Sequence, residues 1–179
     1  MEDLDEIRTK FKDHAKRLGI DFPNVDSGAP HINPTNQQIE QFISLKQSQH
    51  QNKANVITDI GYYNDHQTVD LQQILQWLGT LLDNAFEATI ENPIYVRLVV
   101  TSSRITLSVA NEYLAESSGD LGELFKQGYS TKGEGRGLGL YHLNETVTNL
   151  GGTVTCFEEY NDVHESTYLN VCIKFRTSS

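Results

Sequence analysis

The chain has 179 residues, a length typical of one domain or of one domain with a short extra segment. Its 24 acidic and 14 basic residues give a formal net charge of −10, which disfavours nucleic acid as a partner because clustered Lys and Arg bind phosphate backbones. No apolar run approaches the ~18–20 residues of a membrane span, and the charged N-terminus does not resemble a secretory signal, so we expect a cytoplasmic segment without direct membrane contact.

Residues 1–54 are predicted to form a helical and linker segment that precedes the main domain. Apolar residues at helical spacing predict one helix over 3–18 and a second over 36–53. Residues 19–35 contain three of the four prolines and predict a linker between them. The apolar positions are Leu4, Ile7, Phe11 and Leu18 in the first helix and Ile39, Phe42, Ile43 and Leu45 in the second.

Residues 55–179 are predicted to form an α+β domain. A capping pattern at Asp70 and a proline beyond residue 90 bound its main helix, and Gly151-Gly152 ends the last helix. Paired strands with helices on one face predict a two-layer α/β sandwich with a mixed, mostly antiparallel sheet. The predicted elements are strand 55–63, helix 71–90, strands 94–100 and 104–110, a long loop over 112–136, helix 137–150, and strands 153–159 and 167–175.

The two cysteines, Cys156 and Cys172, fall in the last two predicted strands. They have no CxxC spacing, which disfavours a metal site. We therefore expect both to be buried free thiols.

A polar cluster interrupts the apolar helix 71–90. Thr80, Asn84 and Glu87 are spaced four and three residues apart, so they share one flank of the helix, and Asp83 lies beside them. Such a row is favourable if it meets a ligand, and the Asn84 amide oxygen suits a hard cation such as Mg²⁺. The alternative interpretation is that this flank faces water.

Two further signals lie downstream. Asn111 ends an alternating strand, where its amide can bond to a base edge, although Asn is common at strand ends. The stretch GYSTKGEGRGLGLYHL, residues 128–143, places glycines and the cations Lys132 and Arg136 before a helix N-terminus, which favours phosphate binding. It is neither a Walker A loop nor a dinucleotide fingerprint. The alternative is a flexible glycine-rich loop.

In this order, the motifs resemble the Bergerat-fold ATP-binding domain of gyrase, the heat-shock chaperone, histidine kinases and mismatch-repair ATPases, the GHKL group. LLDNAFEA resembles the N box, VANEY stands at the G1 box, LFKQGYSTK resembles the F box and lid, and GRGLGL resembles the G2 box. The residues of these motifs are most similar to those of histidine kinases of the Agr-like type, which sense peptide pheromones in quorum sensing. The resemblance spans residues 55–175, most of the chain.

The resemblance implies ATP and Mg²⁺ as cofactors and ATP or ADP as bound nucleotides, and it assigns no catalytic residue to this chain. Asn84 would hold the Mg²⁺ that bridges the phosphates, and Asn111 would contact the amino edge of adenine. An Asn in place of the usual G1 Asp is a departure from the superfamily pattern. The implied nucleotide-binding residues are Asn84, Glu87, Asn111, Tyr129, Ser130, Thr131, Lys132, Gly133, Gly135, Arg136, Gly137, Leu138, Gly139 and Leu140.

The implied activity is that of a protein histidine kinase in a two-component system. The γ-phosphate would pass to a histidine on a dimerisation helix, of the same chain or of a homodimer partner, and then to a response regulator. The parent protein would be a membrane-anchored receptor with this domain in the cytoplasm. Members that hydrolyse ATP carry a Glu four residues before the metal-binding Asn, where this chain has Thr80, so ATP hydrolysis is disfavoured.

The sequence contains no His-Asp-x-x-Asn phosphoacceptor string. We therefore hypothesise a catalytic fragment, or a family member without that box, in which residues 1–54 are a remnant of a dimerisation stem. Phosphate on His14 or His50 after incubation with ATP would contradict this hypothesis. The alternatives within the same fold are an ATP-binding regulatory module, such as an anti-sigma-type serine kinase, and a pseudokinase that acts by protein binding.

Overall fold

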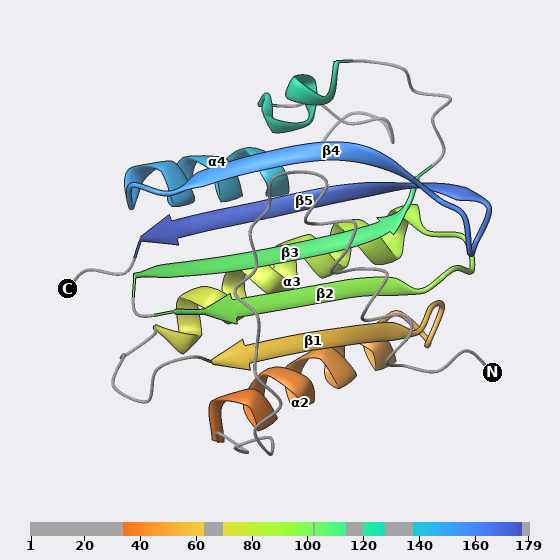
Figure 1. The fold of residues 1–179 in the computed structure, drawn as a ribbon, viewed down its shortest axis with the longest axis horizontal. Coiled ribbons are helices and arrows are strands. Elements are labelled where there is room, and N and C mark those ends of the chain that lie inside the picture. Colours follow the sequence, from red (N-terminus) through yellow and green to blue (C-terminus); the bar gives the residue numbers. More distant parts are fainter. Residues whose placement is uncertain (1–33, 63–69, 102, 114–119, 128–137, 177–179) are drawn as a thin grey trace. The chain divides into compact units, whose positions relative to one another are not determined.

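The computed structural model describes residues 34–62, 70–101, 103–113, 120–127 and 138–176. These residues all belong to one compact unit, Asn33–Ser179 (Figure 1). Among them, no helix is long and apolar enough to cross a bilayer. The elements in chain order are α2 (Pro34–Gln49), β1 (Val56–Tyr62), α3 (Leu71–Ala88), β2 (Ile94–Val100), β3 (Arg104–Glu112), the 3-10 helix η1 (Leu121–Phe125), α4 (Gly139–Asn149), β4 (Thr153–Asn161) and β5 (Ser166–Arg176).

The predicted order of strands and helices from residue 55 onward is confirmed, with element ends that differ by a few residues. The last helix begins at Gly139 rather than at residue 137. The predicted long loop 112–136 contains η1, which the sequence analysis did not anticipate. The predicted helix 3–18 lies outside the described residues.

The sheet has five strands in the order β1-β2-β3-β5-β4. β1 and β2 pair in parallel, joined by the crossover helix α3, and the other neighbours pair antiparallel. A parallel pair requires a crossover connection, which explains why α3 stands between β1 and β2 in the chain. The predicted mixed, mostly antiparallel sheet is therefore confirmed.

The helices cover one face of this sheet. Every second residue of β3, namely Ile105, Leu107 and Val109, joins a single apolar core with α3 and with parts of α2 and α4. Thr106 and Ser108 point to the opposite face, as the alternation predicted. Because the helices that the structure describes pack against the same face, the architecture of the described residues is the predicted two-layer α/β sandwich (Figure 1).

Both cysteines are free thiols. Cys172 is buried and Cys156 is half-buried, and burial raises the pKa of both thiols. Cys172 pairs in register with Thr155, so Cys156 faces the other side of the sheet. Adjacent strands thus carry the two sulfurs on opposite faces, where they cannot form a disulfide.

Helix α2 packs with the sheet domain. Ile39 and Ile43 are fully or almost fully buried in the common core, and Phe42 packs against it, whereas Leu45 is 56% exposed. The compact unit that contains the sheet therefore includes α2. The division into a helical and linker segment, 1–54, and an ATP-binding domain, 55–179, stays a prediction.

The end of α4 is fixed by the two glycines that the sequence analysis identified. Gly151 has φ +78, and its N–H donates to Thr148 O, while the N–H of Gly152 donates to Val147 O. This pair of bonds is the Schellman motif, which requires a residue that tolerates positive φ. A Cβ at Gly152 would lie 2.7 Å from Val147 Cγ1 and 2.9 Å from Lys174 O, so β5 and α4 leave no room there.

We expect Gly152→Ala to lower the free energy of unfolding by about 2 kcal/mol, since forcing extra atoms into a filled site costs about 1–3 kcal/mol. Gly151→Ala serves as the control, because nothing lies within 4 Å of its added Cβ and only the positive φ is strained. Its loss should be smaller, about 1 kcal/mol. Urea unfolding of both variants is the measurement, and a larger loss in Gly151→Ala would contradict the packing argument.

Candidate functional site

Helix α3 carries the polar flank that the sequence analysis singled out. It begins at the N-cap Asp70, whose carboxylate accepts from Gln73 N at 3.1 Å, and this confirms the predicted capping pattern. Ile74, Leu78, Leu81, Leu82 and Ala85 bury its apolar side in the core. The remaining positions therefore define which polar side chains α3 can present to neighbours.

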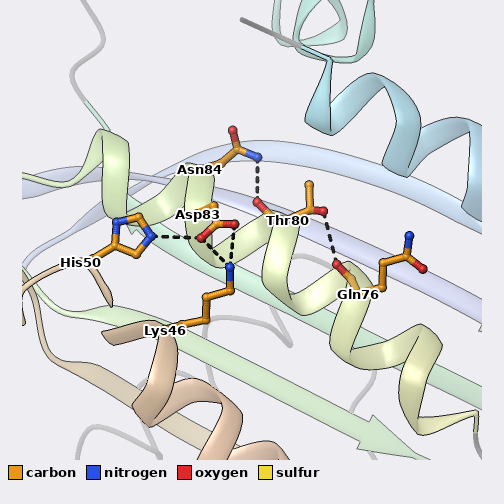
Figure 2. A network of polar contacts seen from close by, with 6 residues as sticks. All are labelled: Lys46, His50, Gln76, Thr80, Asp83 and Asn84. Atoms are coloured by element: carbon orange, nitrogen blue, oxygen red, sulfur yellow. Dashed lines mark hydrogen bonds and ion pairs between the residues drawn. The ribbon is translucent and has the colours of Figure 1, made fainter. Parts of the chain in front are cut away.

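The Asn84 amide has a defined orientation on that flank. Its Nδ2 donates to Thr80 O at 2.8 Å, and the Thr80 hydroxyl in turn donates to Gln76 O at 3.3 Å. Figure 2 shows that the amide oxygen of Asn84 consequently points away from the α3 backbone. A carbonyl oxygen held outward in this way is a suitable ligand for a hard cation. Glu87 lies on the same flank and is exposed.

The N-terminus of α4 lies against Thr80 and Asn84. A Cβ on Gly139 would be 3.4 Å from Thr80 Cγ2 and 3.7 Å from Asn84 Nδ2. Leu138 occupies the N-cap and offers no side-chain acceptor to the N–H groups of the first turn, and Leu140 packs against the core. N–H groups of a helix's first turn favour anions, so the start of α4, beside the Asn84 amide, is a candidate position for a phosphate.

Asn111 is buried near the end of β3. It continues the row of Leu107 and Val109 and therefore lies on the face of the sheet that the helices cover. Its Nδ2 donates to Glu112 O at 2.7 Å, which leaves the carbonyl oxygen Oδ1 as the group able to accept from an exocyclic amino group. β3 runs in the same direction as α3, so Asn111 lies toward the end of the sheet where α3 finishes.

The neighbouring Glu112 has a structural role that the sequence analysis missed. Its carboxylate is buried and accepts from Asn92 Nδ2 at 2.8 Å and from Ile90 N at 3.3 Å. Glu112 thereby ties the loop between α3 and β2 to the end of β3. The signal that would have indicated this contact is the acidic residue next to Asn111, at the end of a strand whose other face is apolar.

Asp83 does not share the flank of Asn84. Lys46 Nζ donates to both of its carboxylate oxygens, at 2.9 and 2.8 Å, and His50 Nε2 lies 3.0 Å from Oδ1 (Figure 2). Partial burial raises the pKa of Asp83, but hydrogen bonds from Lys46 and His50 and their charges outweigh it, so the pKa lies below its ordinary value. Asp83 is thus a contact to α2 rather than a ligand-facing group.

The glycine-rich stretch is only partly described. Leu138, Gly139 and Leu140 belong to the described residues, at the start of α4. The other predicted contacts lie outside the described residues: Tyr129, Ser130, Thr131, Lys132, Gly133, Gly135, Arg136 and Gly137.

Comparisons with known proteins identify the family of this chain and its fold. The sequence profile of the GHKL domain matches residues 68–173, more than half of the chain. The chain belongs to the GHKL family. This GHKL chain is 30% identical to the sensor protein CitS of Bacillus subtilis (strain 168) over 89 residues, which cover 48% of the chain but only 16% of CitS.

Solved histidine kinases share the fold of this GHKL domain. The catalytic domain of the histidine kinase ThkA, in a nucleotide-free form, has a TM-score of 0.59 at 22% identity, over 79% of this chain and 91% of that one. Full-length ShkA in complex with AMPPNP has a TM-score of 0.61 at 17% identity, over 93% of this chain and 34% of that one. At these identities the likeness establishes the α+β fold. The chain spans about a third of ShkA and a sixth of CitS.

We expect Glu112→Ala in this GHKL domain to lower the free energy of unfolding by about 2–3 kcal/mol, because it leaves two donors without a charged acceptor. The matched control is Glu158→Ala, an exposed glutamate on β4, which should change stability by less than about 0.5 kcal/mol. Urea unfolding measures both. Equal losses in the two variants would show that the Glu112 contacts do not stabilise the loop.

Proposed function

We propose that this chain is the ATP-binding catalytic domain of a two-component sensor histidine kinase. ATP would lie between α3 and the start of α4, with its γ-phosphate available to a histidine on a dimerisation helix of the same chain or of a homodimer partner. A response regulator would receive the phosphate next. The proposed location is the cytoplasm, as part of a larger receptor, and the Agr-like pheromone type remains the proposed subfamily.

The observation that carries this proposal is the juxtaposition of the Asn84 amide with the N-terminus of α4. The two groups are complementary, since an outward carbonyl oxygen suits a cation and the N–H groups of a helix's first turn suit an anion. Gly139 keeps them within contact distance of each other. A Mg²⁺-bound polyphosphate presents both charges together, so it matches this pair of groups better than a simple anion does.

The donor set fits a magnesium ion that arrives with the nucleotide. Within the described ranges, no group of three His, Cys, Asp or Glu side chains converges on one point, which disfavours a cation cage built by the protein alone. Mg²⁺ commonly takes one or two protein oxygens together with substrate phosphates and waters. Bound there, it would neutralise charge on the transferring phosphoryl group, while Asn84 would orient it and Asn111 Oδ1 would accept from the adenine amino group.

Transfer to another group is favoured over hydrolysis of ATP. Thr80 lacks a basic group, and its hydroxyl is engaged with Gln76 O, so it supplies no general base for water. His50 contacts Asp83, and its ring stacks on Phe86 with the ring centroids 4.7 Å apart. These contacts favour a packing role for His50 over that of a phosphoacceptor. A regulatory module that binds ATP and acts on a protein partner, such as an anti-sigma-type serine kinase or a pseudokinase, is the second candidate, because such a module requires no phosphoacceptor string.

We expect Asn84→Ala to weaken Mg²⁺-ATP binding by about tenfold or more, because it removes the proposed metal ligand at a cost of about 1.4 kcal/mol per tenfold. The control is Gln72→Ala, which removes an exposed amide from the same helix. Calorimetric titration with ATP and ADP, with and without Mg²⁺, is the measurement. Absence of binding by the unmodified chain at millimolar nucleotide would overturn the proposed function.

A size series at Gly139 tests the position of the phosphates independently. Gly139→Ala adds a Cβ at ordinary contact distance from Thr80 and Asn84, so nucleotide affinity should change by less than about threefold. Gly139→Val adds branches that press on both side chains, and we expect affinity to fall by about tenfold or more. Thermal unfolding separates this loss from misfolding. Equal affinities across the series would place the phosphates elsewhere.

A further inference from the structure

Helices α2 and α3 make a set of contacts that advance together along both helices. A Cβ on Gly79 would lie 3.2 Å from Phe42 Cζ, so the absence of a side chain lets the Phe42 ring rest on α3. One turn later Lys46 binds Asp83, and at the end of α2 the His50 ring stacks on Phe86 with an interplanar angle of 13°. We call the six residues Phe42, Lys46, His50, Gly79, Asp83 and Phe86 the α2–α3 clamp.

Each clamp residue of α3 directly precedes one residue of the polar flank that we propose faces the nucleotide. Thr80, Asn84 and Glu87 directly follow the three clamp positions of α3 in the sequence. One residue corresponds to about 100° around a helix axis, so the two sets form adjacent stripes on the same turns of α3. Figure 2 shows Lys46 and His50 approaching Asp83, while the Asn84 amide points away from α2. A rotation of α3 about its axis would move both stripes together.

Within the clamp, the Lys46–Asp83 ion pair is the contact that can hold α3 in one rotation about its axis. Lys46 contacts both carboxylate oxygens, and its side chain is only 19% exposed, against 44% for Asp83. Loss of the carboxylate would leave the charge of this mostly buried Lys46 side chain without its partner, and we expect α3 to turn or shift in response.

We propose that Asp83 and Lys46 are positioning residues for nucleotide binding: the pair fixes the rotation of α3 and thereby the direction of the Asn84 amide oxygen toward Mg²⁺-ATP. This inference rests on the proposed function and deepens it. In this proposal, α2 contacts no nucleotide but influences nucleotide binding through α3. A change in how α2 packs would therefore alter the affinity for Mg²⁺-ATP.

Calorimetric titration of four variants tests the proposal. Asp83→Asn and Lys46→Met each remove one charge of the pair, whereas Lys46→Arg keeps it. Glu40→Gln is the matched control, because it removes a carboxylate charge from an exposed position of α2. We expect the two charge-removing variants to weaken Mg²⁺-ATP binding by about fivefold or more, the low end of typical coupling between sites. Lys46→Arg and Glu40→Gln should bind like the unmodified chain.

The magnesium dependence separates positioning from general destabilisation. If the pair acts through Asn84, then the Mg²⁺-dependent gain in ATP affinity shrinks in Asp83→Asn and Lys46→Met, and affinity for Mg²⁺-free ATP changes little. A merely structural pair would leave the gain unchanged in every variant that folds, as judged by a cooperative thermal transition. Lys46→Met provides a second route if Asp83→Asn does not fold.

The outcomes distinguish the two proposals. Folded Asp83→Asn and Lys46→Met variants that keep the full magnesium-dependent gain would overturn the positioning role and leave the proposed function standing. An unmodified chain that binds no Mg²⁺-ATP would overturn the proposed function, and the positioning role with it. An effect of Glu40→Gln equal to that of Asp83→Asn would indicate a general charge effect and also contradict the inference.

Discussion

The burial of α3 against the sheet is the interaction on which the rest of the structure depends. A single helix of 18 residues places Ile74, Leu78, Leu82 and Phe86 among the most deeply buried side chains of the protein. This burial removes apolar area from water, which stabilises the fold by roughly 25 cal/mol per Å² of buried area. It also determines which positions of α3 are left for polar contacts. One stripe of these positions meets α2, and the next meets the start of α4.

The local pattern was enough to predict most of the fold. The spacing of leucines in α3, its cap at Asp70 and the alternation in β3 are properties of short segments, and the predictions made from them were confirmed. The end of α4 at Gly151 and Gly152 was predicted equally well, because a Schellman motif depends only on a few consecutive residues. The parallel pairing of β1 with β2 was not predicted, since it depends on where α3 crosses.

The partners of the polar residues could not be predicted in the same way. Asp83 was grouped with Asn84 because the two are adjacent, yet its partner Lys46 lies 37 positions away, and no local pattern encodes that register. Asn111 and Glu112 are adjacent as well, but the alternation of β3 turns Asn111 to the helix-covered face while Glu112 holds the loop of Ile90 and Asn92. Adjacent residues of a strand or helix point in different directions, so neighbours in the sequence can make contacts with different elements.

The parallel course of α2 and α3 has an electrostatic consequence. Two helices side by side in the same direction bring their C-terminal ends together, and each end carries a partial negative charge. Gln51 and Asn52 turn the chain after α2 through two residues with positive φ, and Lys53 then donates to Phe86 O at 3.0 Å. Lys53 therefore places a full positive charge where two negative ends meet, which offsets the repulsion that parallel packing creates.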